Sequence, residues 1–164
     1  MSKSTITSLV SLVVIVIAVI LIVILVPGKN NNGTKKSSNS FTAQQKNTAT
    51  NEIKNNVKTF FAVNTSMATR VNLLQNGSQF AKPMEAEFSQ LDNQKPSVIV
   101  NSINFTNQSN ATINYTVELN GQPVLKNQNG TVLYINKTWK VSDSTLCQLL
   151  SMDGYTPSVC TSVH

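Results

Sequence analysis

Two cysteines are the most reactive side chains of this 164-residue chain, Cys147 and Cys160, and they stand 13 positions apart. In a domain outside the cytoplasm such a pair favours a structural disulfide. Closing a loop of this size stabilises a fold by about 3 kcal/mol in the chain-entropy description. The alternative is a redox or metal-binding pair, but the sequence has no Cys-x-x-Cys motif and one histidine, His164, so a metal site would lack ligands. We predict a disulfide and no metal.

The acidic residues offer little for acid–base catalysis. Glu85 and Glu87 are two positions apart on a predicted helix, so their side chains do not converge. Asp143 is expected to cap a helix, and Glu118 to lie on the polar face of a strand. No Gly-x-Ser-x-Gly, phosphate-loop or dinucleotide motif occurs. The sequence therefore predicts a protein that is not an enzyme and has no catalytic residues and no cofactor. The other acids are Glu52, Asp92 and Asp153.

The positive charge is concentrated at one end. The formal net charge is +6, and residues 1–40 contribute +4 of it through four lysines and no acid, which leaves +2 for the remainder. A nucleic-acid surface needs clustered basic residues interleaved with exposed aromatic rings. Beyond residue 40 the lysines are scattered and the aromatic residues fall at predicted core positions, so we expect no nucleic-acid partner.

A long apolar run predicts a membrane anchor. Residues 9–26 contain one polar member, Ser11, and as a helix they would span about 27 Å, close to the hydrocarbon thickness of a bilayer. The alternative is a cleaved secretory signal, whose apolar core would be only about 7–15 residues long. We favour the uncleaved anchor. The predicted segments are a cytoplasmic tail (1–5), a transmembrane helix (6–26), a flexible Asn-, Ser- and Lys-rich linker (27–42) and an extracytoplasmic domain (43–164).

Orientation rests on the cysteine pair and on nine Asn-x-Ser/Thr sequons. Because lysines flank both ends of the apolar run, the positive-inside rule does not decide it. Sequons are glycosylation acceptors in exported domains, although asparagine is common in this chain and favours turns in any case. We predict a single-pass cell-membrane protein with its C-terminal domain outside. The candidate glycosylation sites are Asn32, Asn64, Asn76, Asn104, Asn107, Asn110, Asn114, Asn129 and Asn136.

The hydrophobic periodicity predicts an α+β domain in which N-terminal helices pack on one curved antiparallel sheet. The period is helical before Pro96 and alternating after it. Asn76-Gly77 is expected to end the second helix, and Pro83 to lie in the first turn of the third. The expected helices are 43–63, one around Met67–Leu74, 82–91 and 144–152; the expected strands are 97–106, 111–119, a weak 124–126, 130–135 and 138–142.

Four aromatic residues define a candidate cleft between the helices and the sheet. Strand alternation predicts that Ile99, Ile103 and Phe105 share one face, and that Ile113, Tyr115, Val117, Tyr134 and Trp139 point inward. Such a cleft would hold a small apolar ligand or a segment of an envelope protein. The alternative is that these rings simply form the core. The candidate cleft residues are Phe60, Tyr115, Tyr134 and Trp139.

Several separated motifs resemble one family, over about residues 50–160. They are Phe60-Phe61, residues 71–77 (VNLLQNG), Phe80-Ala81, residues 111–116 (ATINYT), residues 121–123 (GQP), residues 129–131 (NGT), residues 138–141 (TWKV), residues 147–150 (CQLL) and residues 157–160 (PSVC). They resemble the mycobacterial low-molecular-weight secreted antigen and its actinobacterial relatives, exported or lipid-anchored envelope proteins.

The resemblance implies a cystatin-like or nuclear transport factor 2-like cone, and it does not imply an activity. The chain departs from it in its predicted transmembrane helix, where relatives have a cleaved signal or a lipid-bearing cysteine, and in being rich in Asn where they are rich in Ala. We therefore expect a membrane-anchored envelope protein with a non-catalytic binding domain. The alternatives are a surface structural subunit that assembles through its glycan-free face, and a cryptic small-molecule enzyme of the same fold.

Overall fold

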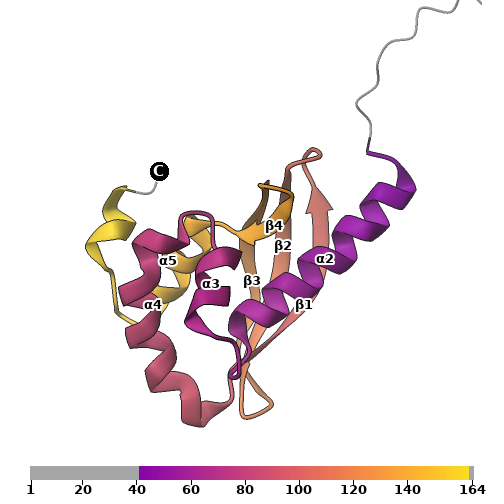
Figure 1. Ribbon diagram of the computed structural model, residues 1–164. Coiled ribbons are helices and arrows are strands. Elements are labelled where there is room, and N and C mark those ends of the chain that lie inside the picture. Colours follow the sequence, from indigo (N-terminus) through magenta and orange to yellow (C-terminus); the bar gives the residue numbers. More distant parts are fainter. Residues whose placement is uncertain (1–40, 163–164) are drawn as a thin grey trace, which may run out of the picture. The chain divides into compact units, whose positions relative to one another are not determined.

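The computed structural model describes residues 41–162, except the side chain of Asp92 (Figure 1). The predicted transmembrane helix 6–26, with the tail before it, and residues 27–40 of the predicted linker lie outside this range. Among the described residues, no helix combines the length and the apolar character needed to cross a bilayer.

The described part of the chain has the predicted α+β class. A four-stranded antiparallel sheet has the order β1-β2-β3-β4. Figure 1 shows α2 running diagonally across the sheet, with α3, α4 and α5 gathered beside it. The elements are α2 (Ala43–Phe61), α3 (Met67–Leu73), α4 (Gly77–Leu91), η1 (Asp92–Gln94), β1 (Ser97–Phe105), β2 (Asn110–Leu119), β3 (Gln122–Ile135), β4 (Thr138–Val141), α5 (Asp143–Met152) and η2 (Ser158–Ser162).

Helix α2 starts where the sequence predicts, because Thr42 and Gln45 form a capping box. The Gln45 backbone N–H donates to the Thr42 hydroxyl (3.2 Å), and the Thr42 N–H donates to the Gln45 side-chain carbonyl (2.9 Å). One residue earlier, the Phe41 ring packs edge-to-face on Phe105 at 5.0 Å between centroids. Phe41 and Thr42, the last residues of the predicted linker, thus belong to the fold. The apolar stripe of this helix is buried: Ile53, Val57, Phe60 and Phe61.

The boundary between α3 and α4 differs from the prediction. Gly77 is the first residue of α4 and does not end α3, which stops at Leu73. Pro83 consequently lies inside α4 and not in its first turn. The helix extends back past the proline because Phe80, Met84 and Phe88 form one stripe that is buried in the core. Burial of that stripe outweighs the backbone hydrogen bond that Pro83 cannot donate.

A bulge in β1 reverses part of the predicted alternation. Ile99 is 49% exposed, and Val98 is buried in its place. The register with β2 shifts between Val100 and Ser102, so Asn101 is an extra residue in the ladder. One extra residue changes the parity of the alternation, because side chains alternate with a period of two. Only after the bulge do the odd-numbered positions turn inward, as the half-buried Ile103 and Phe105 show.

Strand β3 is a single strand, whereas the sequence suggests two short ones. It pairs with β2 from Leu119↔Gln122 to Asn110↔Leu133, through the polar stretch that the alternation pattern treats as loop. Two-residue turns lie in two of the gaps between the expected strands. Asn120-Gly121 and Asn136-Lys137 have positive φ at both positions, as the tight turns of hairpins require.

The first turn of α5 completes the edge of the sheet. Beyond the last β3–β4 pair, both backbone groups of Thr131 bond to residues at the start of α5. The Thr131 N–H donates to the Thr145 hydroxyl (2.7 Å), and the Thr131 carbonyl accepts from the Ser142 N–H (3.0 Å). Ser142 is also the N-cap, since its hydroxyl accepts from the Thr145 N–H. The expectation that Asp143 caps this helix is therefore wrong.

Asp143 instead joins the start of α5 to the α3–α4 turn. Its carboxylate accepts from the backbone N–H of Asn76 (3.1 Å) and from the Asn76 side-chain amide (2.5 Å). The Asp143 N–H in turn donates to the Gln75 side-chain carbonyl (3.3 Å). The residue is buried, and these bonds satisfy a group that would otherwise be costly to bury.

The predicted disulfide is confirmed. Cys147 on α5 and Cys160 on η2 are bonded, with an S–S distance of 1.99 Å and a Cα–Cα distance of 5.5 Å. Pro157, inside the closed loop, is buried, and Val159 packs against the core. The bond holds the last described segment of the chain against α5.

Candidate functional site

The four residues of the predicted cleft separate into two pairs. Phe60 and Tyr115 are fully enclosed in the hydrophobic core, where Phe60 contacts Phe61 and Phe88 edge-to-face. Trp139 is also buried but lines an open groove. Tyr134, predicted to point inward, is 41% exposed and lines the same groove beside Trp139. The four side chains do not form one cleft.

Tyr115 is a core residue whose hydroxyl finds no hydrogen-bond partner among the described residues. Its ring packs where Gly130 leaves room: a Cβ at position 130 would lie 3.1 Å from the ring and 2.8 Å from the Thr145 methyl group. Burial raises the pKa of the Tyr115 phenol to about 12. A neutral tyrosine enclosed by apolar side chains has no acid–base partner, which agrees with a structural role.

Replacing Tyr115 with phenylalanine should stabilise the fold. At pH 7 the variant loses a buried hydroxyl that lacks a partner, which favours it by about 1 kcal/mol. In wild type the unfolded phenol ionises near pH 10 and the folded one only near 12. The contribution of Tyr115 to folding stability is therefore intact below pH 10 and falls by roughly 3 kcal/mol as the pH rises to 12. Denaturant titrations at pH 7 and pH 11 should show a smaller alkaline loss in Y115F.

The exposed Tyr155 provides the matched control for this prediction. Tyr155→Phe should leave both the stability at pH 7 and the alkaline loss as in wild type, because its ring is not part of the core. A Y115F variant less stable than wild type at pH 7 would contradict the prediction, since it would mean that the hydroxyl makes a stabilising contact.

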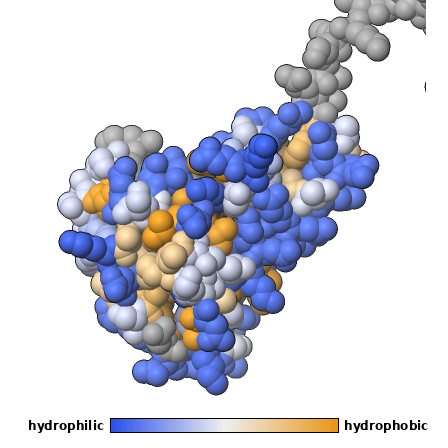
Figure 2. Space-filling model, viewed as in Figure 1, coloured by the Kyte–Doolittle hydropathy of each residue, from blue (hydrophilic) through white to orange (hydrophobic). Residues whose placement is uncertain are grey.

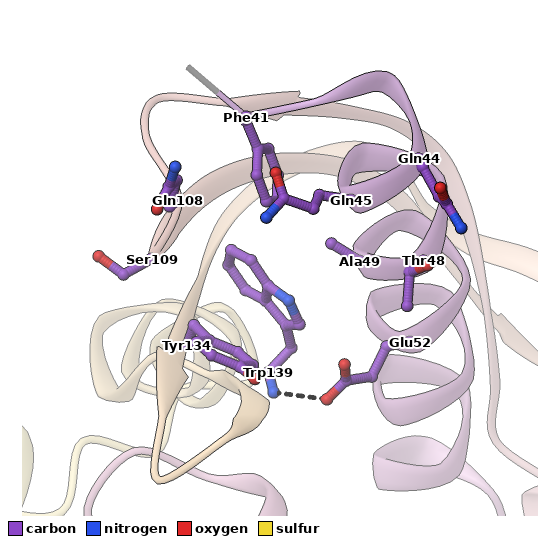
Figure 3. A pocket seen from close by; sticks show the side chains of 10 residues that line it. All are labelled: Phe41, Gln44, Gln45, Thr48, Ala49, Glu52, Gln108, Ser109, Tyr134 and Trp139. Atoms are coloured by element: carbon purple, nitrogen blue, oxygen red, sulfur yellow. Dashed lines mark hydrogen bonds between the residues drawn. The ribbon is translucent and has the colours of Figure 1, made fainter. Parts of the chain in front are cut away.

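The groove that contains Tyr134 and Trp139 is the larger of two candidate sites, and we call it the aromatic groove (Figure 3). It has a volume of about 630 Å³. One wall is the first half of α2, and the other is formed by the β1–β2 turn and the β3–β4 hairpin. Figure 3 shows the Trp139 side chain between Tyr134 and α2, with Gln45 and Glu52 of α2 reaching toward it. Its lining residues are Phe41, Gln44, Gln45, Thr48, Ala49, Glu52, Gln108, Ser109, Tyr134 and Trp139.

Helix α2 fixes the position of Trp139 through both of its backbone groups. The Trp139 N–H donates to a Glu52 carboxylate oxygen (3.1 Å), and its carbonyl accepts from the Asn56 side-chain amide (2.9 Å). The ring is further held between Phe105 (5.8 Å between centroids) and Tyr134 (5.4 Å). Because Glu52 already accepts a backbone hydrogen bond, it serves to position the strand and is poorly placed as a general base.

The predicted cleft did not include the polar wall of this groove, although the sequence of α2 contains a signal for it. The buried stripe of α2 continues backward from Ile53 by helical spacing to Ala49 and Gln45, where the apolar residues give way to a small and a polar one. This change marks the point at which the helix face leaves the core and lines a groove. The groove thus combines aromatic rings with amide, hydroxyl and carboxylate groups, a composition suited to binding.

A second, more apolar site lies between α4, α5 and the sheet, and we call it the apolar cavity. Its volume is about 270 Å³. Phe61, Val117 and Leu150 belong to its buried lining, while Val124 and Met152 are about half exposed. Glu87 and Asp153 also line it. Burial, and secondarily the negative charge of Asp153, raise the pKa of the Glu87 carboxyl. The sequence gives no sign that these two acids line one cavity, because Glu87 lies on α4 and Asp153 follows the end of α5.

Among residues 41–162 no group of three His, Cys, Asp or Glu side chains is placed to hold a metal ion.

The sequons remain a prediction, and Asn32 lies outside the described residues. The side-chain amide of Asn76 donates to Asp143, and that of Asn114 donates to Asn129 (3.2 Å). The exposed sequon residues are Asn64, Asn76, Asn104, Asn107, Asn129 and Asn136, and the half-buried ones are Asn110 and Asn114.

Comparison with known proteins adds a family. A family model described as the C-terminal domain of the low molecular weight antigen MTB12 matches residues 45–157. The match runs from the first turns of α2 through α5 and includes both candidate sites almost entirely. No curated protein matches the chain.

Proposed function

The chain belongs to the family of the low molecular weight antigen MTB12, through the C-terminal domain of that family, and from this premise we propose its function. It is a membrane-anchored cell-envelope protein whose extracytoplasmic domain, a cone similar to nuclear transport factor 2, binds a ligand or a partner segment and does not catalyse a reaction.

Two observations support the proposed location. The apolar run 9–26 has the length and composition of a single transmembrane helix. The bond between Cys147 and Cys160 is of the kind that persists in oxidising compartments outside the cytoplasm. The sequons agree with an exported domain. Together these features favour an anchor with the domain on the outer side.

The aromatic groove is the observation that carries the binding role. It is wide and open, the backbone of Trp139 is held by two hydrogen bonds to α2, and an exposed tyrosine lies at its surface. Its lining contains no cysteine, histidine or lysine, so no imidazole or amine of the lining can activate its aliphatic hydroxyl groups, those of Thr48 and Ser109. Pre-positioned aromatic groups with convergent polar side chains favour recognition over chemistry.

Site-specific photocrosslinking of the full chain in its own membrane tests this proposal. A photoreactive amino acid at Thr48, inside the groove, should give a discrete adduct with a protein or lipid. The same amino acid at Lys54, exposed on α2 but outside the groove lining, should not. Equal adducts at both positions, or none at Thr48, would count against the groove.

Tyr134→Ala should weaken this adduct about tenfold. An exposed aromatic side chain at a binding site contributes about 1–2 kcal/mol when it is truncated. Tyr155→Ala is the matched control, because Tyr155 has the same 41% exposure and lies away from the groove. The yield of the Thr48 adduct at graded expression levels measures the difference. An unchanged yield in Y134A would contradict the role of this ring.

A further inference from the structure

The apolar cavity has a lining of an unusually simple kind. Twelve of its fourteen lining side chains are apolar, and the two others are the carboxylates Glu87 and Asp153. No lining side chain carries a hydrogen-bond donor in its ionised form at neutral pH. A ligand can therefore bury an apolar body in this cavity. Of its polar groups, only a hydrogen-bond donor or a positive charge would find a partner there.

The geometry of the cavity limits the size of such a ligand. Its volume of about 270 Å³ lies just under the roughly 300 Å³ at which pockets for drug-sized molecules begin. Phe61, Val117 and Leu146 in its lining are buried. Figure 2 shows that apolar side chains reach the surface over the shorter helices, whereas the outer face of α2 is hydrophilic.

The two acids come from separate elements and meet at this cavity. Glu87 lies on α4, and Asp153 follows the last turn of α5. Neither carboxylate has a hydrogen bond or ion pair within residues 41–162. Burial, and secondarily the nearby negative charge of Asp153, raise the pKa of the Glu87 carboxyl. A cation between the two carboxyl groups would offset the effect of the Asp153 charge.

We propose that the apolar cavity binds a small amphiphile with a cationic head, such as an alkylamine, whose apolar body packs against Phe61, Val117 and Leu146 while its ammonium group lies between Glu87 and Asp153. An anionic amphiphile of equal length meets two like charges and no donor. A neutral alcohol can donate a hydrogen bond to a carboxylate but gains no attraction between opposite charges. The cavity should therefore select among amphiphiles by the sign of the head group. This site is separate from the aromatic groove, and neither proposal depends on the other.

Three probes of equal chain length test the proposal: hexylammonium, hexanoate and 1-hexanol. The full chain, labelled with ¹³C at its methionine methyl groups, is studied in zwitterionic lipid nanodiscs. Met152 lines the cavity, whereas Met67 is outside it and reports non-specific binding. Hexylammonium should shift the Met152 signal in a saturable manner, leave Met67 unchanged, and bind at least tenfold more tightly than hexanoate. Equal binding of hexylammonium and hexanoate, or no shift at Met152, would overturn the proposal.

Charge variants identify the groups that hold the head. The double variant Glu87→Gln with Asp153→Asn should reduce hexylammonium binding to the level of 1-hexanol, because only the apolar contacts remain. Glu85→Gln, exposed on the same helix and absent from the lining, is the matched control and should bind as wild type does. Val124→Trp, at a half-exposed position, should block all three probes without disturbing the core. Undiminished binding in the double variant would show that the acids are not the recognition groups.

Discussion

Replacing Gly77 with alanine should destabilise the domain by about 3 kcal/mol or more, the upper part of the range for overpacked sites. A Cβ at this position would overlap the carbonyl oxygen of Val71 and lie 2.7 Å from its carbonyl carbon. These are backbone atoms of α3, so no side-chain rotation can relieve the clash. The α3–α4 turn must open, and it takes with it the bonds from Asn76 to Asp143. Thermal unfolding of the full chain, followed by circular dichroism, measures the loss.

Gly121 provides a control that separates steric from conformational effects. Gly121 has a φ of +73°, but its surroundings are open, so alanine there meets only the conformational cost of the left-handed region, about 1–2 kcal/mol. Gly77 has no such φ, and its requirement is for space. G77A should therefore be clearly less stable than G121A. The opposite order would mean that the two helices can separate without loss of packing.

Removing the disulfide should produce the second large effect. Replacing both Cys147 and Cys160 with serine releases a loop of 13 residues, which costs about 3 kcal/mol in the chain-entropy description. For a domain of this size the expected fall in the melting temperature is roughly 10–15 °C. The destabilisation should be concentrated in α5 and η2. Relative to wild type, amide hydrogen exchange in the variant should increase more there than in β2, which lies inside the sheet.

Reduction of the wild-type protein gives an independent check on the same bond. A thiol reductant should lower the melting temperature of wild type to that of the double serine variant and have no effect on the variant itself. If reductant leaves wild type unchanged while the serine variant is destabilised, the substitutions act through packing, since Cys147 and Cys160 also contact the core.

The parts of the fold that depend on local patterns were predictable. The start of α2, the alternation along β2 and the two turns that contain asparagine each depend on residues a few positions apart, and each is present. The disulfide was predictable because the chain contains only two cysteines. The errors come from non-local contacts. Nothing near Gly77 indicates that its space is taken by the backbone of Val71, and nothing near Asn101 indicates the bulge in β1.

The candidate sites were only partly predictable for the same reason. Aromatic residue types are equally suited to a core and to a groove, so the sequence could not separate Tyr115 from Tyr134. Tyr134 is exposed because it stands near the end of β3, where few elements cover it. Glu87 and Asp153 are far apart in the chain, and only the fold brings α4 and the end of α5 to the same cavity.

The bulge in β1 has a consequence for how copies of this domain behave in each other's presence. β1 is an outer strand of the sheet, and an outer strand with a regular row of free N–H and C=O groups can pair with the same strand of another copy. Asn101 interrupts that row and twists the strand at its midpoint. The proposed membrane anchor would bring copies of the domain together at high local concentration. The irregularity that defeats the simple alternation pattern is therefore also a protection against aggregation along the sheet edge.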